Sequence, residues 1–178
     1  MKMTENVILV DENDRETGLM EKMEAHLQGM LHRAFSVFIF TSKGELLLQQ
    51  RAEDKYHSGG KWTNTCCSHP REGENTVNAA HRRLKEEMGM NCKLVYGFHF
   101  IYRAELLNGI YEHEYDHVFF GVSDQTPVPD PAEVASFKYV DMISLANDIR
   151  VNPQLYTEWL KICFDRVTET YQEILDNL

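Results

Sequence analysis

Hydrophobic and polar residues alternate along several short stretches of the chain, which is typical of β-strands with one buried face. The predicted strands cover residues 7–10, 32–40, 45–51, 62–67, 94–102, 111–122 and 137–140. The second and third of these flank a short glycine-containing link, and the fifth and sixth flank Asn108-Gly109. Both pairs therefore predict antiparallel hairpins.

A helical spacing of apolar residues is clearest over residues 74–88, and Gly89 follows as a stop signal. One face of this predicted helix carries Val77, Ala80, Leu84 and Met88. A long amphipathic helix is expected over about 154–178 and a helical turn over 144–149, whereas 16–26 fits a loop or a helix. Mixed strands with few helices predict an α+β fold, built as an α/β/α sandwich around a mixed β-sheet.

The length of 178 residues favours a single domain spanning residues 1–178. With 43% hydrophobic and 11% aromatic residues, the chain can form a core, which excludes intrinsic disorder. Its longest apolar runs, such as residues 35–40, are too short to cross a bilayer. The first residues carry no apolar signal, and the four cysteines form no C-x-x-C pair. We therefore expect a cytoplasmic protein with reduced thiols.

The formal net charge of −10 opposes binding to nucleic acids and anionic membranes, so neither is an expected partner. A small anionic ligand would need a local cluster of lysine and arginine. Oligomeric state is not fixed by the sequence, and a monomer or weak homodimer is expected.

Three acidic residues alternate along the predicted strand 111–122, namely Glu112, Glu114 and Asp116. Alternation places them on one face of the sheet, where their charges repel unless a cation or a proton lies among them. A solvated sheet edge is the alternative interpretation.

The same strand contains His113-Glu114-Tyr115-Asp116-His117, which matches the H-E-x-x-H motif of zinc proteases. That motif requires a helix, whereas on a strand the two histidines stand ~13 Å apart. A zinc protease is therefore the disfavoured alternative.

The segment 62–70 reads Trp-Thr-Asn-Thr-Cys-Cys-Ser-His-Pro. Adjacent cysteines on a strand point to opposite faces, so only one of Cys66 and Cys67 can face a given pocket. Two interpretations stay open: buried thiols that fill space, or one low-pKa thiol acting as a base or nucleophile near a cation.

The predicted helix 74–88 carries two i,i+4 pairs, Arg82 with Glu86 and Arg83 with Glu87, which would stabilise the helix. The acids could also hold Mg2+, and the arginines could hold phosphate.

This helix and its preceding loop resemble the Nudix motif, G-x5-E-x7-R-E-U-x-E-E-x-G-U, where U is a bulky aliphatic residue. The matching residues are Glu74, Arg82, Leu84, Glu86, Glu87, Gly89 and Met90. Ser68 stands in place of the first glycine, and Arg83 in place of a glutamate. The resemblance implies a Nudix-like fold, and the exchange of an acid for Arg83 suggests a protein that holds a diphosphate without cleaving it.

From about residue 5 to 165, the chain also resembles the type I isopentenyl diphosphate isomerases. The similarity lies in Glu21-Lys22, His26, His32, Gln50-Arg51, Lys55, the whole segment 62–70, Tyr102-Arg103-Ala104 and Glu112-His113-Glu114. It implies interconversion of isopentenyl and dimethylallyl diphosphate through a tertiary carbocation. A Nudix pyrophosphohydrolase and a catalytically inactive Nudix binding module are the alternatives.

The same resemblance implies roles for individual residues. Catalysis would fall to Cys67, Glu114 and Tyr102. A Mn2+ or Zn2+ ion would be held by His26, His32, His69, Glu112 and Glu114, with about residues 1–30 completing the site. Mg2+ would bind Glu87 and the main-chain carbonyl of Cys67. The diphosphate would meet Lys22, Arg51, Lys55, Arg82 and Arg83, and Trp159 would lie over the substrate tail.

Overall fold

A computed structural model describes residues 5–175 of the chain. Its strands are β1 (Asn6–Val10), β2 (Glu16–Glu21), β3 (His32–Phe40), β4 (Leu46–Arg51), β5 (Trp62–Thr63), β6 (Cys66–Ser68), β7 (Val95–Glu105), β8 (Tyr111–Val122) and β9 (Val134–Val140). Its α-helices are α1 (Lys22–Gln28), α2 (Thr76–Met88), α3 (Met142–Val151) and α4 (Glu158–Leu175). Short 3₁₀ turns span Leu107–Gly109 and Pro153–Leu155.

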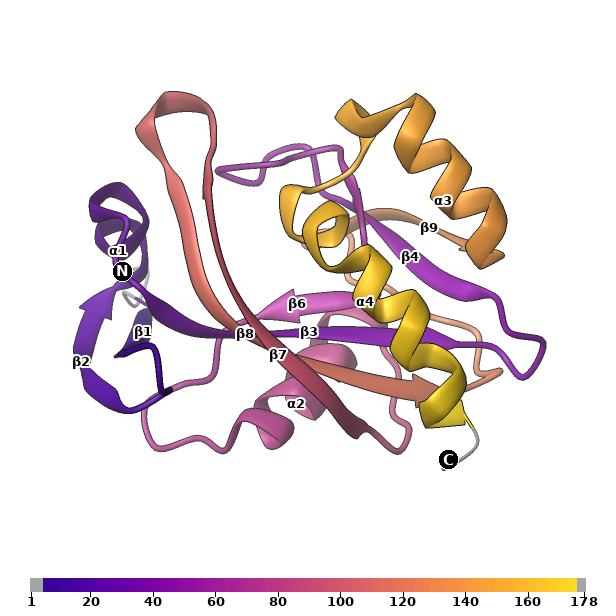
Figure 1. Cartoon of the computed structure of the whole chain (residues 1–178), viewed down its shortest axis with the longest axis horizontal. Coiled ribbons are helices and arrows are strands. Elements are labelled where there is room, and N and C mark those ends of the chain that lie inside the picture. Colours follow the sequence, from indigo (N-terminus) through magenta and orange to yellow (C-terminus); the bar gives the residue numbers. More distant parts are fainter. Residues whose placement is uncertain (1–4, 176–178) are drawn as a thin grey trace.

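Strand β3 is the centre of one mixed sheet (Figure 1). It runs parallel to β8, with a register from His32 opposite Glu114 to Phe40 opposite Val122, and antiparallel to β6. Both predicted hairpins are confirmed, since β4 pairs antiparallel with β3 and β7 with β8. The strands that carry the segment 62–70 and the acidic residues thus lie on either side of β3.

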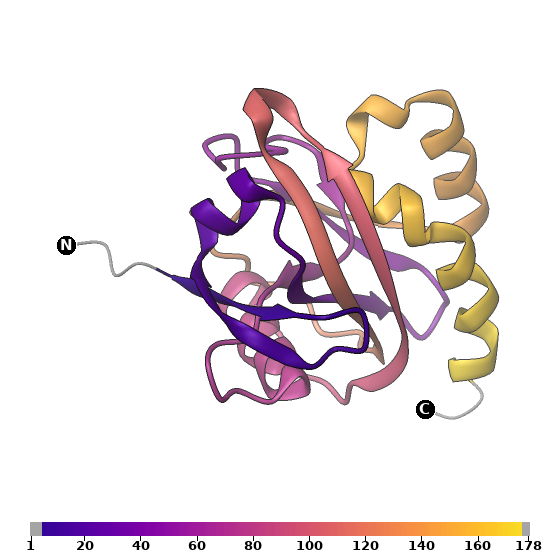
Figure 2. The same ribbon diagram turned by 60° about the vertical axis from the view of Figure 1, so that its left-hand side comes forward.

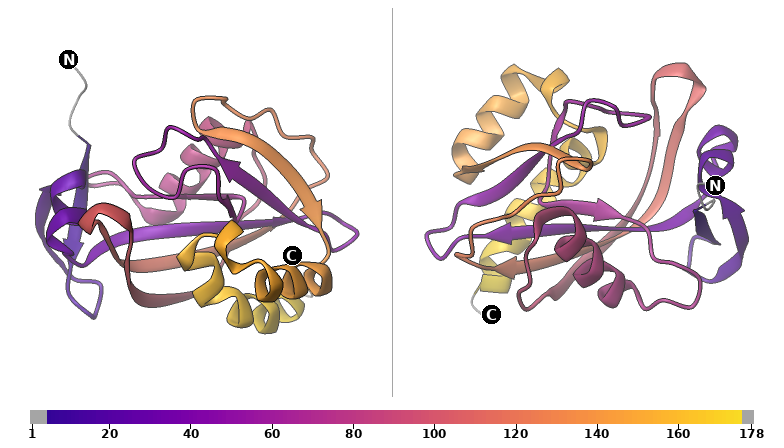
Figure 3. Two further views of the ribbon diagram at one scale, coloured as in Figure 1. Left: turned by 90° about the horizontal axis from the view of Figure 1, so that it is seen from above. Right: turned by 180° about the vertical axis from the view of Figure 1, so that it is seen from behind.

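Helices cover both faces of this sheet, as Figure 3 shows from above and from behind. Helix α2 packs Leu84 and Met88 against Val37 on one face, whereas α4 packs Leu160 against Phe38 on the other. Neighbouring residues of β3 therefore enter two different cores, as strand alternation requires. The predicted α/β/α sandwich with a mixed sheet is confirmed.

The helix ends follow local chemistry. Asn75 caps α2 by accepting a hydrogen bond from the backbone N–H of Val77 at 3.0 Å, and Gly89 ends it with φ of 64°. Helix α4 begins at Glu158 rather than near residue 154. Ahead of it, the backbone N–H of Thr157 donates to the carbonyl of Trp62 at 3.0 Å, so this part of the chain joins the sheet edge first.

The stretch 16–26 is a strand followed by a short helix, not a single loop or helix. Strands β1 and β2 form a hairpin, and α1 then returns the chain against β8 (Figure 2). Helix α1 ends at Gly29, whose left-handed φ of 63° turns the backbone into β3. This arrangement brings His26 and His32 from adjacent elements to the same end of β8. Among residues 5–175, no helix is both long and apolar enough to span a membrane.

Candidate active site and metal centre

A pocket of ≈ 580 Å³ lies over the sheet, beneath loop 52–61 and beside α4. Cys67 from β6 and Glu114 from β8 both line it. Trp159 of α4 forms part of its wall, and four cationic side chains surround it, namely Lys22, Arg51, Lys55 and Arg83. The thiol and the carboxylate that the family resemblance singled out therefore share one cavity.

The acidic face of β8 is buried: Glu112, Glu114 and Asp116 are 2%, 7% and 1% exposed. The solvated-edge interpretation is therefore wrong, because these residues face the interior of the protein. Tyr102, opposite Glu114 in the β7–β8 register, donates its hydroxyl to Glu114 Oε2 at 2.6 Å. Burial raises the pKa of Tyr102 well above its usual range, so this phenol keeps its proton at neutral pH.

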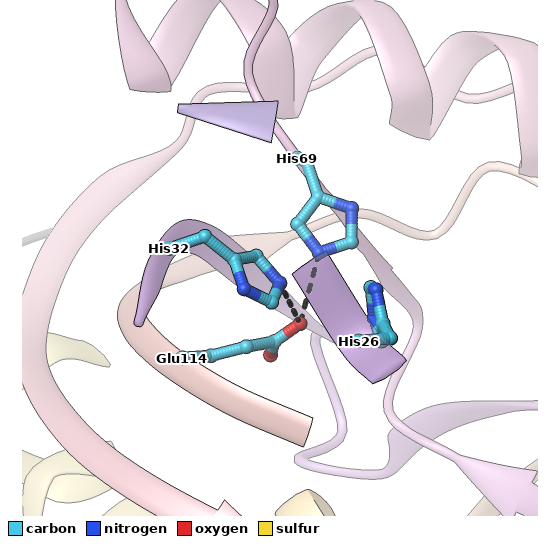
Figure 4. A group of neighbouring side chains, drawn as sticks. All are labelled: His26, His32, His69 and Glu114. Carbon is cyan, nitrogen blue, oxygen red and sulfur yellow. Dashed lines mark hydrogen bonds and ion pairs between the residues drawn. The ribbon is translucent and has the colours of Figure 1, made fainter. Parts of the chain in front are cut away.

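Three histidines gather around Glu114 (Figure 4). Glu114 Oε1 lies 2.9 Å from His69 Nε2 and 3.5 Å from His32 Nε2. The rings of His26 and His32 are 4.9 Å apart between centroids, and those of His32 and His69 are 5.0 Å apart. One ligand atom from each of His26, His32, His69 and Glu114 lies within 4.8 Å of the others. These four residues, from α1, β3, the end of β6 and β8, form the four-donor group.

The donor atoms of this group fit a divalent metal ion. His26 Nδ1 lies 2.6 Å from the carbonyl of Lys22, and His32 Nδ1 lies 2.8 Å from that of Met30. A carbonyl oxygen only accepts, so in the neutral form both rings carry their proton on Nδ1 and turn the Nε2 lone pair inward. Among the described residues, neither buried Nε2 has a hydrogen-bond partner. Imidazole nitrogens with carboxylates suit ions such as Mn2+ or Zn2+.

Electrostatics favour the protonation states that a cation needs. Burial opposes ionisation of Glu114, but the nearby imidazoles of His32 and His69 outweigh it and lower the pKa of Glu114 well below its usual range. Burial lowers the pKa of His69 to about 4. At neutral pH, the centre therefore holds an ionised carboxylate and a neutral imidazole, which are the forms that bind metal.

Glu112 lies slightly apart from the four-donor group. Its Oε1 is 2.6 Å from His57 Nε2 and 3.4 Å from His26 Nε2, so it gathers with those two histidines. Sequence reasoning left His57 unassigned, because it lies in an aperiodic polar loop with no motif around it. Only the folded structure brings it beside the acidic face of β8.

The two adjacent cysteines face opposite sides, as strand alternation predicts. Cys66 is buried in the core beneath α2, whereas Cys67 lines the pocket. Burial raises the pKa of the Cys67 thiol far more than the nearby Arg51 guanidinium lowers it, and the Glu87 and Glu114 carboxylates raise it further. The thiol is therefore protonated in this structure, which differs from the low-pKa thiol considered from the sequence.

The cationic side of the pocket is rich in ion pairs. Arg83 Nη2 lies 2.6 Å from Glu87 Oε1 and 3.4 Å from Glu133 Oε2. Lys55 also pairs with Glu133, a residue that sequence reasoning did not identify because it follows an irregular loop. Glu87 is buried, and its second oxygen accepts from Gln49 Nε2 at 2.9 Å.

Arg82 is the predicted diphosphate residue that the structure does not bring to the pocket. Successive residues of an α-helix point about 100° apart, so Arg82 and Arg83 leave α2 in different directions. Arg82 Nε lies 2.7 Å from Glu74 Oε1, and its guanidinium also meets Glu86. Arg82 therefore forms ion pairs that stabilise helix α2, which is the alternative role considered for it from the sequence.

Trp159 lies at the pocket wall with its indole fixed by a hydrogen bond from Nε1 to Asn64 Oδ1, at 3.1 Å. The guanidinium of Arg51 lies 5.4 Å from the centre of the ring. Trp62, the other tryptophan, instead packs against Lys138 and the α4 core.

The H-E-x-x-H match is accidental, as strand geometry predicted. His113 Nδ1 lies 2.8 Å from the carbonyl of Gly29, and His117 Nε2 lies 2.9 Å from Asp14 Oδ2. The two histidines contact different parts of the N-terminal segment, so they cannot share one ion.

Comparison with known proteins agrees with this arrangement. The NUDIX domain family model matches residues 30–160. An isopentenyl-diphosphate Delta-isomerase of Pectobacterium atrosepticum is 53% identical over 172 residues, covering 97% of this chain and 96% of the relative. Isopentenyl-diphosphate Delta-isomerase 1 of Aromatoleum aromaticum is 54% identical over 171 residues, covering 96% of this chain and 97% of the relative.

Among solved structures, DR0079 from Deinococcus radiodurans superposes with a TM-score of 0.78 at 19% identity, covering 91% of this chain and 98% of that one. A MutT protein from Methanosarcina mazei gives a TM-score of 0.65 at 18% identity, covering 78% and 94%. These two likenesses concern the fold. The family match and the high identity to the curated relatives place the chain in the NUDIX domain family and, within it, among the isopentenyl-diphosphate Delta-isomerases.

Proposed function

We propose that this protein interconverts isopentenyl diphosphate and dimethylallyl diphosphate. The relatives bear the name of this activity, and one observation of the chain itself carries the proposal. Cys67 and Glu114 line a single pocket whose rim is formed by Lys22, Arg51, Lys55 and Arg83. An allylic proton shift requires an acid and a base on the hydrocarbon and cations on the diphosphate.

The reaction moves one carbon–carbon double bond by one position. A proton added to the terminal carbon of isopentenyl diphosphate makes a tertiary carbocation. Either Glu114 or Tyr102 delivers this proton, and their 2.6 Å hydrogen bond supports a relay between the two. Cys67 then takes a proton from the carbon nearer the diphosphate, which leaves the double bond in its new place.

In the forward direction, the acid begins protonated and Cys67 begins as a thiolate. The structure favours the opposite distribution, with Glu114 ionised and the thiol neutral. The two distributions differ only in which of the two groups, Glu114 or Cys67, carries the proton, and the number of bound protons is the same in both. The state described here is therefore the one that starts the reverse reaction, in which Cys67 donates and Glu114 accepts.

The metal assignments are part of the proposal. Mn2+ or Zn2+ would bind His26, His32, His69, Glu112 and Glu114, and Mg2+ would bind Glu87 with the Cys67 carbonyl. Such ions, when bound, tune the pKa of a ligating carboxylate and neutralise part of the diphosphate charge. The chain contributes buried donor atoms with inward lone pairs and few competing hydrogen bonds.

The carbocation must be shielded from water, because water would convert it to an alcohol. Trp159 is 4% exposed and lies at the pocket wall, where an indole face could stabilise a cation by ~2 kcal/mol once desolvated. The hydrogen bond to Asn64 fixes the plane of the ring. We assign Trp159 to the hydrocarbon tail for these reasons.

The cations around the pocket explain how a chain of net charge −10 can bind a trianion. Lys22, Arg51, Lys55 and Arg83 provide local positive charge, with charge-assisted hydrogen bonds of the kind that hold phosphates. Arg83 occupies the position of a Nudix acid and is tied to Glu87, which removes negative charge from the cluster that would gather hydrolytic metals.

Incubation with isopentenyl diphosphate, Mg2+ and trace Mn2+ or Zn2+, followed by product analysis, tests the proposal. We expect dimethylallyl diphosphate and no inorganic phosphate or pyrophosphate. Release of either anion from this substrate or from a nucleotide panel would instead support a pyrophosphohydrolase. Binding without any turnover would support an inactive Nudix module.

A further inference from the structure

Loop 52–61 carries one histidine, His57, that contacts three different parts of the pocket. Its Nε2 lies 2.6 Å from Glu112 Oε1, and its carbonyl accepts from Arg51 Nη2 at 3.3 Å. Its ring meets that of Trp159 edge-on at 6.0 Å. One residue thus reaches the metal centre, a cation of the diphosphate side and the wall of the hydrocarbon side.

The contact between His57 and Glu112 sets Glu112 apart from the other four predicted metal ligands. Four side chains form the four-donor group, whereas Glu112 gathers with His26 and His57. His26 cannot serve a second ion, because Lys22 holds its Nδ1 and only Nε2 is left for a metal. His57 and Glu112 therefore extend the metal centre formed by the four-donor group and do not form a second metal site.

Side chains attach the middle of the loop to the pocket. Where the loop begins and ends, Arg51 donates to Lys61 at 2.9 Å, Gly60 donates to Arg51 at 3.1 Å, and the N–H of Ala52 donates to the carbonyl of Glu133 at 3.0 Å. Within the loop, the N–H of Lys55 donates to the carbonyl of Ala52 at 3.3 Å. Between these ends, Lys55 reaches the pocket through Glu133, and His57 reaches it through Glu112. The His57 contact with Glu112 is a hydrogen-bonded connection between the middle of the loop and the metal centre, and the Tyr56 ring also meets that of His26 edge-on at 5.7 Å.

We propose that His57 is a positioning residue that orients Glu112 by donating its Nε2–H, and that this bond couples loop 52–61 to the metal centre. The proposal rests on the metal centre of the proposed function. Carboxylate ligands of metals are held by outer hydrogen bonds, and loss of such a partner costs about 10–100-fold in metal affinity. A metal ion bound at the centre would fix the position of Glu112. The hydrogen bond from His57 to Glu112 would then hold His57 in place, together with the loop that carries Lys55.

The test measures Mn2+ affinity by chelator competition and hydrogen exchange of residues 52–61 with and without Mn2+. We expect His57→Ala to weaken Mn2+ binding by about 10–100-fold and to remove the protection that Mn2+ gives the loop. His57→Gln keeps an N–H donor near the Nε2 position and should restore part of both effects. His81→Ala, a histidine of α2 outside the pocket lining, is the matched control and should behave as wild type.

Unchanged Mn2+ affinity in His57→Ala would overturn the positioning role. Loop exchange in the wild type that is the same with and without Mn2+ would overturn the coupling. Both readouts are independent of turnover, so a failure of the isomerase assay leaves them interpretable. If the wild type binds no Mn2+, Zn2+ or other divalent ion, the metal centre itself fails, and the proposal falls with it.

Discussion

The two sides of the pocket differ in how their polar atoms are satisfied. On the histidine side, the Nε2 atoms of His26 and His32 are buried and have no hydrogen-bond partner among the described residues. On the arginine side, Lys55 and Arg83 already pair with Glu133, and Arg83 pairs with Glu87 as well. The buried Nε atoms of Arg51 and Arg83 have no hydrogen-bond partner among the described residues, but the positive charges of Lys55 and Arg83 are paired. The histidine side presents imidazole nitrogens without a partner, whereas the arginine side presents side-chain charges that are paired with carboxylates.

This difference indicates two modes of binding. A cation can enter the histidine side with little rearrangement, because buried unsatisfied lone pairs are stabilised by gaining a ligand. A diphosphate must instead exchange with carboxylates on the arginine side, so its affinity depends on which ion pairs it displaces. Changes to the histidine side should therefore affect the chemical step, and changes to the arginine side should affect substrate binding.

Removal of the pocket thiol should have the largest effect. Cys67→Ala deletes the proposed base or acid on one side of the substrate, so we expect kcat to fall by about 10⁴-fold, the upper range for a proton-transfer group. Steady-state kinetics measures this loss, and circular dichroism checks the fold. Cys66→Ala is the matched control, since Cys66 points into the α2 core and should keep nearly full activity. Near-normal turnover of Cys67→Ala would remove the thiol from the mechanism.

Glu114→Gln should come next, with kcat lowered by about 10²–10³-fold while metal is still bound. Glutamine keeps an oxygen for the ion but cannot carry the transferred proton. Turnover should be measured together with the metal content of the same sample. Retained turnover at full metal content would move the acid role to Tyr102 or elsewhere.

Arg83→Glu tests the arginine side. Reversing this charge removes the ion pairs with Glu87 and Glu133 and should raise KM for the diphosphate by roughly 10–100-fold, as expected for a lost charge-assisted hydrogen bond. The change also restores the acid of the Nudix motif. We expect no release of inorganic phosphate, and its appearance would contradict the view that the rest of the pocket is built for isomerisation.

The smallest expected effect is a pH dependence of metal binding. Burial favours neutral His26, but the Glu112 carboxylate, 3.4 Å from Nε2, outweighs burial and raises the pKa of His26 above its usual value. Below that pKa, Nε2 carries a proton. A metal ion must displace that proton, so Mn2+ affinity should rise by about tenfold per pH unit from pH ~6.5 up to the raised pKa and then level off. Titration with Mn2+ at several pH values measures this slope. A flat profile would show that His26 does not bind the ion.

The sequence predicted the elements with strong periodicity. Helix α2, its stop at Gly89 and the alternation that buries Glu112, Glu114 and Asp116 on one face all follow from local spacing. The opposite orientations of Cys66 and Cys67 follow from the same rule. The strand β2 was missed because residues 16–21 are mostly exposed and carry no clear alternation.

The site could be predicted only in part. The family resemblance supplied residues that lie on many separate elements, and the structure places all of them at the pocket or the metal centre except Arg82. His57 and Glu133 could not be predicted, because both lie in or after irregular loops where spacing carries no information. The protonated state of Cys67 could not be predicted from the sequence either, since it depends first on the burial of the thiol in the folded protein.

Two separate groups of the pocket, both in exchange with solvent, are proposed to add and remove protons on one hydrocarbon. Incubation of the wild-type protein with isopentenyl diphosphate in D2O, followed by NMR of the product, tests this proposal most directly. We predict dimethylallyl diphosphate with deuterium in the newly formed methyl group. A product that carries no deuterium would contradict proton exchange between these groups and solvent. Release of free phosphate without formation of dimethylallyl diphosphate would contradict the isomerase activity.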